Sequence, residues 1–117
     1  MSEWQESKPQ LDYVSESQPL VMRATWTLKM QSVGLWTSNF PATVWLDKMI
    51  HVFGQFDSGE VVWEGSNDGI HWLRLEHLRF PYEDLTPAGV TPAMIRPKVL
   101  HGTNETALTA ILVGRKP

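Results

Sequence analysis

The chain contains 117 residues with a net charge of −3 and no cysteine, and hydrophobic residues make up 42% of it. This length fits one domain with one core, since domains typically contain about 100 to 150 residues, and the lack of cysteine excludes disulfides, thiolate catalysis and cysteine-bound zinc. The ten Lys and Arg residues are scattered, which argues against nucleic-acid binding because neutralising phosphates needs clustered cations.

Residues 1–19 have the composition of an extended arm, because they are rich in Ser, Glu and Gln and contain two prolines. They carry no secretory signal, and the chain has no run of about 18 apolar residues, so we expect no membrane contact and synthesis in a cytoplasm. Trp4, Leu11 and Tyr13 stand out in the arm, and they either fold back onto their own domain or dock on a neighbouring subunit. So few apolar residues do not offset an ordering cost of about 1 to 2 kcal/mol per residue, and we expect the arm to be disordered in the free protein.

The clearest strand is predicted for residues 20–31, where apolar and polar side chains alternate with a period of two. Small and polar residues end this strand, and residues 42–46 form either a short strand or an extended edge. Trp36 and Phe40 fall in the loop between these segments. We consider three roles for these two aromatic rings: part of the core, a protein interface, or a platform on which a sugar stacks.

A meander of three strands is predicted for residues 49–75. Residues 49–64 are interpreted as a β-hairpin that turns at residues 57–59, and residues 70–75 form the third strand after a second turn. The residues of this second turn are given a structural role, because short polar side chains and glycine suit a tight turn: Ser66, Asn67, Asp68 and Gly69.

Residues 77–93 contain three prolines and are predicted to cross the end of the domain without regular structure. Strands are predicted at residues 94–100 and 106–113. Pro97 restricts the first of these to a sheet edge or a bulge, because proline has no N–H to donate.

The predicted fold class is therefore all-β: an antiparallel β-sandwich or jelly-roll-like single domain at residues 20–117, with an extended N-terminal arm at residues 1–19. Three tryptophans on or beside the predicted strands are expected in the core: Trp26, Trp63 and Trp72.

No constellation of side chains in the sequence points to catalysis or to a metal site. The four histidines lack the spacing of a metal-binding motif: His51, His71, His77 and His101. Three carboxylates near the predicted hairpin could be paired by folding, as a glycosidase requires, although one sequence does not establish their separation: Asp57, Glu60 and Glu64. The chain also lacks a Gly-rich phosphate loop and a G-x-S-x-G motif. We therefore expect no enzymatic activity, no cofactor and no metal.

Two segments carry a resemblance to a known family. Residues 61–72 resemble the strand, G-S-N-D-G turn and tryptophan of small β-sandwich proteins in bacteriophage structural modules. Residues 94–99, followed by Gly102-Thr103 and the strand at 106–113, are similar to the closing I-R-P-x-V, G-T and alternating-strand pattern of these proteins. The chain thus looks like the capsid decoration, or cement, proteins of tailed phages. The S-N-D-G-x-x-W segment also occurs in discoidin-like carbohydrate-binding sandwiches.

The resemblance implies a virion structural protein that binds the outside of the assembled phage head and stabilises contacts between major capsid proteins. The expected partner is the major capsid protein, and the expected location is the capsid surface of the virion. The arm and the loop at residues 32–42 would be the contact surfaces, with the arm becoming ordered on the shell. A homodimer or homotrimer is expected, because several copies gain avidity on repeated sites. The alternatives are a phage tail, baseplate or fibre module, and a discoidin-like carbohydrate-binding module.

Overall fold

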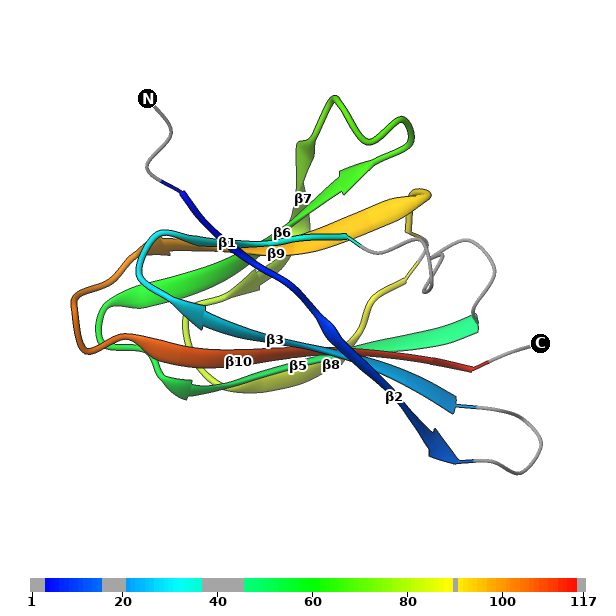
Figure 1. The fold of residues 1–117 in the computed structure, drawn as a ribbon, viewed down its shortest axis with the longest axis horizontal. Coiled ribbons are helices and arrows are strands. Elements are labelled where there is room, and N and C mark those ends of the chain that lie inside the picture. The colour runs from blue at the N-terminus through cyan, green and yellow to red at the C-terminus, as the bar shows by residue number, and fades with distance from the viewer. Residues whose placement is uncertain (1–3, 16–20, 37–45, 90, 116–117) are drawn as a thin grey trace.

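The computed structural model describes residues 4–15, 21–36, 46–89 and 91–115, and every regular element in these segments is a β-strand. The strands form two five-stranded sheets packed face to face (Figure 1). Sheet A contains, in spatial order, β1 (Gln5–Ser7), β4 (Ser32–Gly34), β9 (Met94–His101), β6 (Gly59–Ser66) and β7 (Leu73–Phe80). Sheet B contains β2 (Gln10–Ser15), β3 (Val21–Lys29), β10 (Ala107–Arg115), β5 (Leu46–Gln55) and β8 (Asp84–Pro87). The prediction of an all-β, jelly-roll-like sandwich is confirmed.

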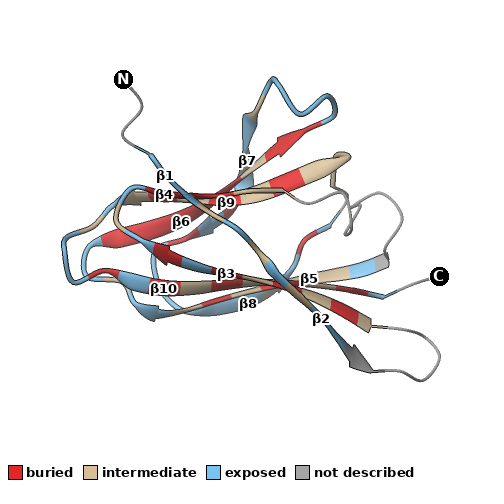
Figure 2. Cartoon of the chain, viewed as in Figure 1, coloured by how far each residue is buried: buried red, intermediate tan, exposed pale blue. Residues whose placement is uncertain are grey.

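The core lies between the two sheets and is built from the inward faces of their central strands. On β3 the buried side chains alternate with more exposed ones, as the sequence predicts for a strand with one covered face. Figure 2 shows the buried residues gathered on the strands that border the space between the sheets. The largest fully buried side chains include Trp26 of sheet B and Trp63 of sheet A, which fill the middle of this space. Trp26 and Trp63 therefore have the predicted core positions.

The predicted hairpin at residues 49–64 is wrong. β5 pairs with β10 and β8 in sheet B, whereas β6 pairs with β7 and β9 in sheet A. The turn between them, with Asp57 and Ser58 at positive φ, carries the chain from one sheet to the other. A tight turn between two apolar strands does not distinguish a hairpin from a sandwich corner, because the ladder partners that decide between them are distant in sequence.

The segment that follows the second turn contains more regular structure than the sequence predicts. The pairing of β6 with β7 is confirmed, but β7 starts at Leu73 rather than at residue 70 and continues to Phe80. β8 forms within the stretch predicted to be irregular and includes Pro87, and it pairs with β5. Leu78 and Phe80 anchor this region, since both are buried in the core. Tertiary burial thus outweighs the local turn signals of residues 77–93.

The described part of the N-terminal arm is paired with the sandwich. β1 runs parallel to β4, and β2 runs antiparallel to β3, so the chain passes from the edge of sheet A to the edge of sheet B (Figure 1). Leu11 packs against the core. These hydrogen bonds and this burial offset the ordering cost, which corrects the expectation of a disordered arm for residues 4–15. The expected boundary after residue 19 lies outside the described residues.

Pro97 lies in an interior strand, which corrects the expectation of a sheet edge or bulge. β9 has β6 on one side and β4 on the other, but β4 pairs with it only at Val33 and Lys98. The absent N–H of Pro97 is tolerated because the ladder on the β4 side is so short. Gly34 allows the close approach: a Cβ atom there would lie 2.6 Å from Cδ of Pro97. The predicted strand at residues 42–46 lies outside the described residues except for Leu46, where β5 starts.

Candidate functional site

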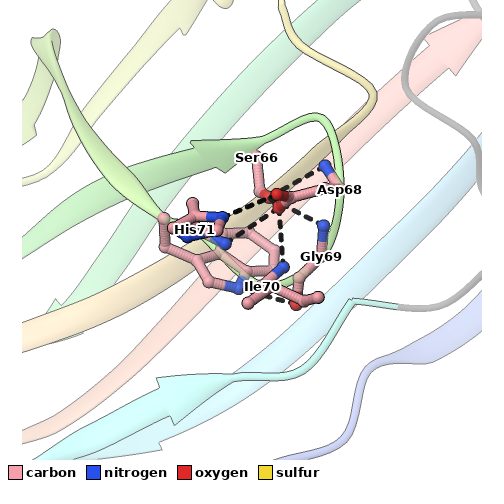
Figure 3. Close-up of polar contacts among 6 residues, drawn as sticks. Ser66, Asp68, Gly69, Ile70 and His71 are labelled. Atoms are coloured by element: carbon pink, nitrogen blue, oxygen red, sulfur yellow. Dashed lines mark hydrogen bonds and ion pairs between the residues drawn. The ribbon is translucent and has the colours of Figure 1, made fainter.

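The turn between β6 and β7 is organised by two short polar side chains (Figure 3). The hydroxyl oxygen of Ser66 accepts the backbone N–H of Gly69 at 2.8 Å and donates to Oδ1 of Asp68 at 3.0 Å. Oδ1 of Asp68 in turn accepts the backbone N–H groups of Ile70 and His71, each at 2.8 Å, and Oδ2 lies 2.7 Å from Nδ1 of His71. These hydrogen bonds satisfy the backbone of a turn that has no ladder partner.

Hydrogen bonding also stabilises the charged form of Asp68. The side chain of His71 and the backbone N–H groups of His71 and Ile70 hold the pKa of the Asp68 carboxyl well below its usual range. Asn67 ties the turn to the neighbouring segment, because its Oδ1 accepts the N–H of Ala93 at 2.9 Å. The structural role predicted for residues 66–69 fits these contacts.

The turn presents two apolar side chains to solvent. Ile70 and Leu73 are each 76% exposed, which makes them the most exposed large hydrophobic residues in the described chain. A groove of 450 Å³ beside them is lined by Leu73, Leu75 and Pro92 together with polar atoms of the turn. We call residues 66–73 the turn tip. Ile70 and Leu73 were not among the predicted site residues, although two branched apolar residues close after a turn signal are a recognisable feature.

The outer face of sheet A carries a second group of organised polar residues. Glu64 on β6 lies opposite Arg96 on β9 and accepts a hydrogen bond from Nε of Arg96 at 2.9 Å. The ammonium nitrogen of Lys98 lies 3.5 Å from the other carboxylate oxygen of Glu64. Alternation along β9 places Arg96 and Lys98 on the face away from the core, because Ile95 and Val99 face inward.

Two tryptophans lie against these two cations. The guanidinium carbon of Arg96 lies 4.1 Å from the ring centroid of Trp72, and the Lys98 nitrogen lies 4.2 Å from that of Trp4. Both distances are within the range of a cation–π interaction. Trp72 is thus half-buried on the outer face of sheet A, which corrects its predicted place in the core. Its Nε1 donates to the carbonyl oxygen of Gly69, so the turn holds the ring outside the sandwich.

Trp4 lines two depressions on the surface. A groove of 560 Å³ is lined by Trp4, Glu6, Val33, Arg96 and Lys98. A smaller hollow of 300 Å³ is lined by Trp4, Met30, Leu100 and their neighbours. We call the larger of the two the Trp4 groove.

A second ion cluster lies on the same face and fixes the other carboxylate of β6. Glu60 is buried, accepts a hydrogen bond from Nε of Arg79 at 2.5 Å, and lies 3.8 Å from Nε2 of His101. This contact raises the pKa of Arg79 above its ordinary value. Glu60 and Glu64 thus share a face, but each is neutralised by its own cations. Asp57 bonds to Thr103 instead. Each of the three carboxylates is therefore engaged by its own partners.

The other expected interface residues have different positions. Tyr13 on β2 is 55% exposed. Leu11 and Trp36 are partly buried and pack against the core, while Phe40 lies outside the described residues. Sequence reasoning missed Arg96 and Lys98, although their alternation with apolar residues in the predicted strand indicates an outward-facing pair.

The described histidines have separate partners. His51 lies 3.7 Å from Glu83, and Nε2 of His77 lies 3.3 Å from the carbonyl oxygen of Ala88. In the part of the chain that the structure describes, no three His, Asp or Glu side chains gather in a way that could hold a metal ion. The described segments also contain no helix with the length and apolar character needed to span a membrane.

No family model and no curated protein matches the chain. Among solved structures, a cupin domain from Bordetella pertussis Tohama I is similar with a TM-score of 0.48 and 7% identity, over 97% of this chain and 98% of that one. Peruvianin-I, a cysteine peptidase from Thevetia peruviana latex, gives a TM-score of 0.47 and 11% identity, over 92% of this chain and 61% of that one. FeII HppE gives a TM-score of 0.33 and 8% identity, over 91% of this chain and 56% of that one. Similarity at this level carries no argument about activity.

Proposed function

We propose that this chain is a structural protein of a tailed-phage virion that binds the outside of the assembled head and holds neighbouring major capsid proteins together, without catalysis. The observation that carries the proposal is the turn tip. The same G-S-N-D-G segment that resembles phage sandwich proteins builds a rigid turn, and this turn presents Ile70 and Leu73 to solvent.

The segments that carry the resemblance lie together in space. β6 pairs with β9 along its whole length, and Asn67 joins the turn to residue 93. The glycine-containing turn at residues 102–103 is fixed by Thr106, whose hydroxyl oxygen accepts the N–H of Thr103 at 2.9 Å. The β6–β9 ladder and the Asn67 contact support a common structural unit for residues that are 26 or more positions apart in the sequence.

The turn tip has the physical properties of a contact surface. Fully burying a side chain such as Ile70 or Leu73 contributes about 1.5 to 3 kcal/mol. A turn that is already held by Ser66 and Asp68 loses little conformational entropy on binding, so more of this energy appears as affinity. Tyr13 is a second proposed contact because its ring is exposed at the edge of sheet B. Leu11 and Trp36 are left out, since both already pack against the core.

Several copies would bind a shell more strongly than one. A capsid offers the same contact many times, and linking two copies makes the second contact intramolecular. We therefore propose a homodimer or homotrimer on the head. Light scattering of the purified chain, followed by counting of copies on decorated heads by electron microscopy, tests this assembly; a monomer in solution with isolated single copies on the head would contradict it.

Co-sedimentation tests the function directly. The purified chain is mixed with empty heads assembled from the major capsid protein of the same genome, and the bound fraction is measured after pelleting. We expect the double variant I70S/L73S to lose at least tenfold in affinity with an unchanged thermal melt. L85S is the matched control, because Leu85 is also exposed but lies on β8, at the edge of sheet B opposite to Tyr13 on β2. Failure of the native chain to pellet, or pelleting with purified tails alone, would overturn the proposal.

A further inference from the structure

The Trp4 groove has the dimensions of a small-ligand site. Its volume of 560 Å³ falls within the range of about 300 to 1,000 Å³ that is usual for such sites. Trp4 and Val33 supply apolar surface, while Glu6, Arg96 and Lys98 supply polar groups. Trp4 is 37% exposed, so part of its surface is accessible from the groove. A ligand longer than the groove would continue past Trp4 into the hollow of 300 Å³.

Two polar groups of the groove, Arg96 and Lys98, are held in place before any ligand arrives. Glu64 holds Arg96 and Lys98 through its two carboxylate oxygens, and the rings of Trp72 and Trp4 hold them from the side. The side chains of Arg96 and Lys98 retain 22% and 21% exposure, which leaves part of each accessible. Because these long side chains are already immobilised, binding costs little side-chain entropy.

The balance of charge decides the class of ligand. Two cations, Arg96 and Lys98, face two carboxylates, Glu64 within 3.5 Å of both and Glu6 on the wall of the groove. The net charge of the site is therefore close to zero, and neither an anion nor a cation gains a net attraction. A neutral molecule with many hydroxyl groups suits it, because hydroxyls donate to Glu6 and accept from Arg96 and Lys98.

We propose that the Trp4 groove binds a neutral oligosaccharide. The hydroxyl groups of one sugar unit bond to Glu6, Arg96 and Lys98, and the apolar C–H face of a sugar ring lies against the face of Trp4 that Lys98 does not cover, because an aromatic face is electron-rich. The chain of sugar units runs past Trp4 from the groove into the smaller hollow. This site is distinct from the turn tip and would operate whether or not the chain binds a phage head.

Nuclear magnetic resonance of the whole chain tests the site. The six tryptophans give separate indole N–H signals, and the signal missing from the W4F variant identifies Trp4. The probes are neutral hexasaccharides of β-1,4-glucose, α-1,4-glucose, β-1,4-mannose and β-1,4-N-acetylglucosamine, with a hexamer of galacturonic acid as the anionic comparison. We expect at least one neutral probe to shift the Trp4 signal saturably with a Kd of about 0.1 to 1 mM.

Variants separate this site from general effects on the fold. Binding to the variants is followed through the backbone amide signals of Arg96 and Lys98, because W4A has no Trp4 indole signal. W4A and E6Q should each raise the Kd at least tenfold while the thermal melt stays within a few degrees, because both positions are exposed on the first strand and its flank. Y13A is the matched control and should bind as the native chain does. Binding of the galacturonic acid hexamer alone, equal binding by W4A, or no shift with any neutral probe at about 10 mM would overturn the proposal. Pelleting with heads is measured on the same W4A protein, so failure of one proposal does not decide the other.

Discussion

Trp26 and Trp63 extend from opposite sheets and meet edge to face, with ring centroids 5.7 Å apart and ring planes at 80°. Their polar edges differ. Nε1 of Trp26 donates to the carbonyl oxygen of Leu35 at 2.9 Å, whereas Nε1 of Trp63 is buried and has no hydrogen-bond partner among the described residues. A buried N–H without a partner keeps its desolvation cost, so the two tryptophans contribute to stability in different ways.

This difference predicts the order of two matched substitutions. W26F and W63F remove the same atoms from the same core, but only W26F breaks a hydrogen bond and leaves the Leu35 carbonyl oxygen without its donor. We expect W26F to lower the free energy of unfolding by about 1 to 2 kcal/mol more than W63F. Urea unfolding of both variants measures the difference. Equal losses, or a larger loss for W63F, would show that cavity formation at each site outweighs the hydrogen bond.

Asp68 predicts a pH-dependent contribution to stability. Its pKa is lowered in the folded chain, so its contribution is complete above the ordinary pKa of an unfolded aspartate, about 3.9, and is lost as the pH falls through the lower folded value. D68N should therefore lower the melting temperature at neutral pH, and the difference from the native chain should shrink as the pH falls below about 4. D84N is the control, because Oδ1 of Asp84 also accepts a backbone N–H, that of the adjacent Leu85. A D68N deficit that stays constant down to about pH 2 would contradict the role of the ionised carboxylate.

The elements that the sequence predicted best are those whose pattern is local. β3 follows from strict alternation, and the turn at residues 66–69 follows from side chains that bond within the turn itself. The corner at residues 57–59 could not be separated from a hairpin, because its outcome depends on β10, which pairs with β5 from the far end of the chain. Trp72 was placed in the core because a large apolar ring is usually buried. One of the two partners that hold the Trp72 ring on the outer face of sheet A is Arg96, which is 24 positions away in the sequence.

The same limit applies to the candidate sites. Trp4 could be named from the sequence as an exposed aromatic in a polar segment. The Trp4 groove could not be predicted from the sequence, because it joins Trp4 and Glu6 near the N-terminus to Val33 and to two residues of β9. The parallel pairing of β1 with β4 over three residues brings these segments of the chain together. No pattern in the sequence predicts such a short ladder.

Gly54 is predicted to be intolerant of any side chain. It lies in β5 with φ at 126°, and a Cβ atom there would lie 2.4 Å from the carbonyl oxygen of Ala107 on the paired strand. G54A should lower the free energy of unfolding by about 2 to 4 kcal/mol, from backbone strain together with the displaced ladder. Gly89 provides the comparison, because its φ is also positive, at 73°, but its nearest neighbour would lie 3.9 Å away at Nε2 of His77. G89A should cost about 1 kcal/mol, and equal losses in thermal or urea unfolding would refute the steric argument.

The N-terminal segment provides the last prediction, because β1 and β2 should contribute unequally to the fold. β1 consists of three residues with mostly exposed side chains, so deleting residues 1–8 should change the free energy of unfolding by less than about 1 kcal/mol. β2 instead pairs with β3 from Gln10 to Ser15, and Leu11 packs against the core. Deleting residues 1–15 removes this ladder and uncovers the edge of sheet B, which should cost about 2 kcal/mol or more.

L11A and Y13A divide the loss between burial and the ladder. L11A should lower the free energy of unfolding by about 1 to 2 kcal/mol, since the Leu11 side chain is partly buried. Y13A should change the free energy of unfolding little, because the ring is exposed. Unfolding in urea measures all four proteins, and the slope of the transition reports whether the truncated chains still expose a comparable surface. If the chain without residues 1–15 unfolds at the same urea concentration as the full chain, β2 contributes nothing to stability and the prediction is wrong.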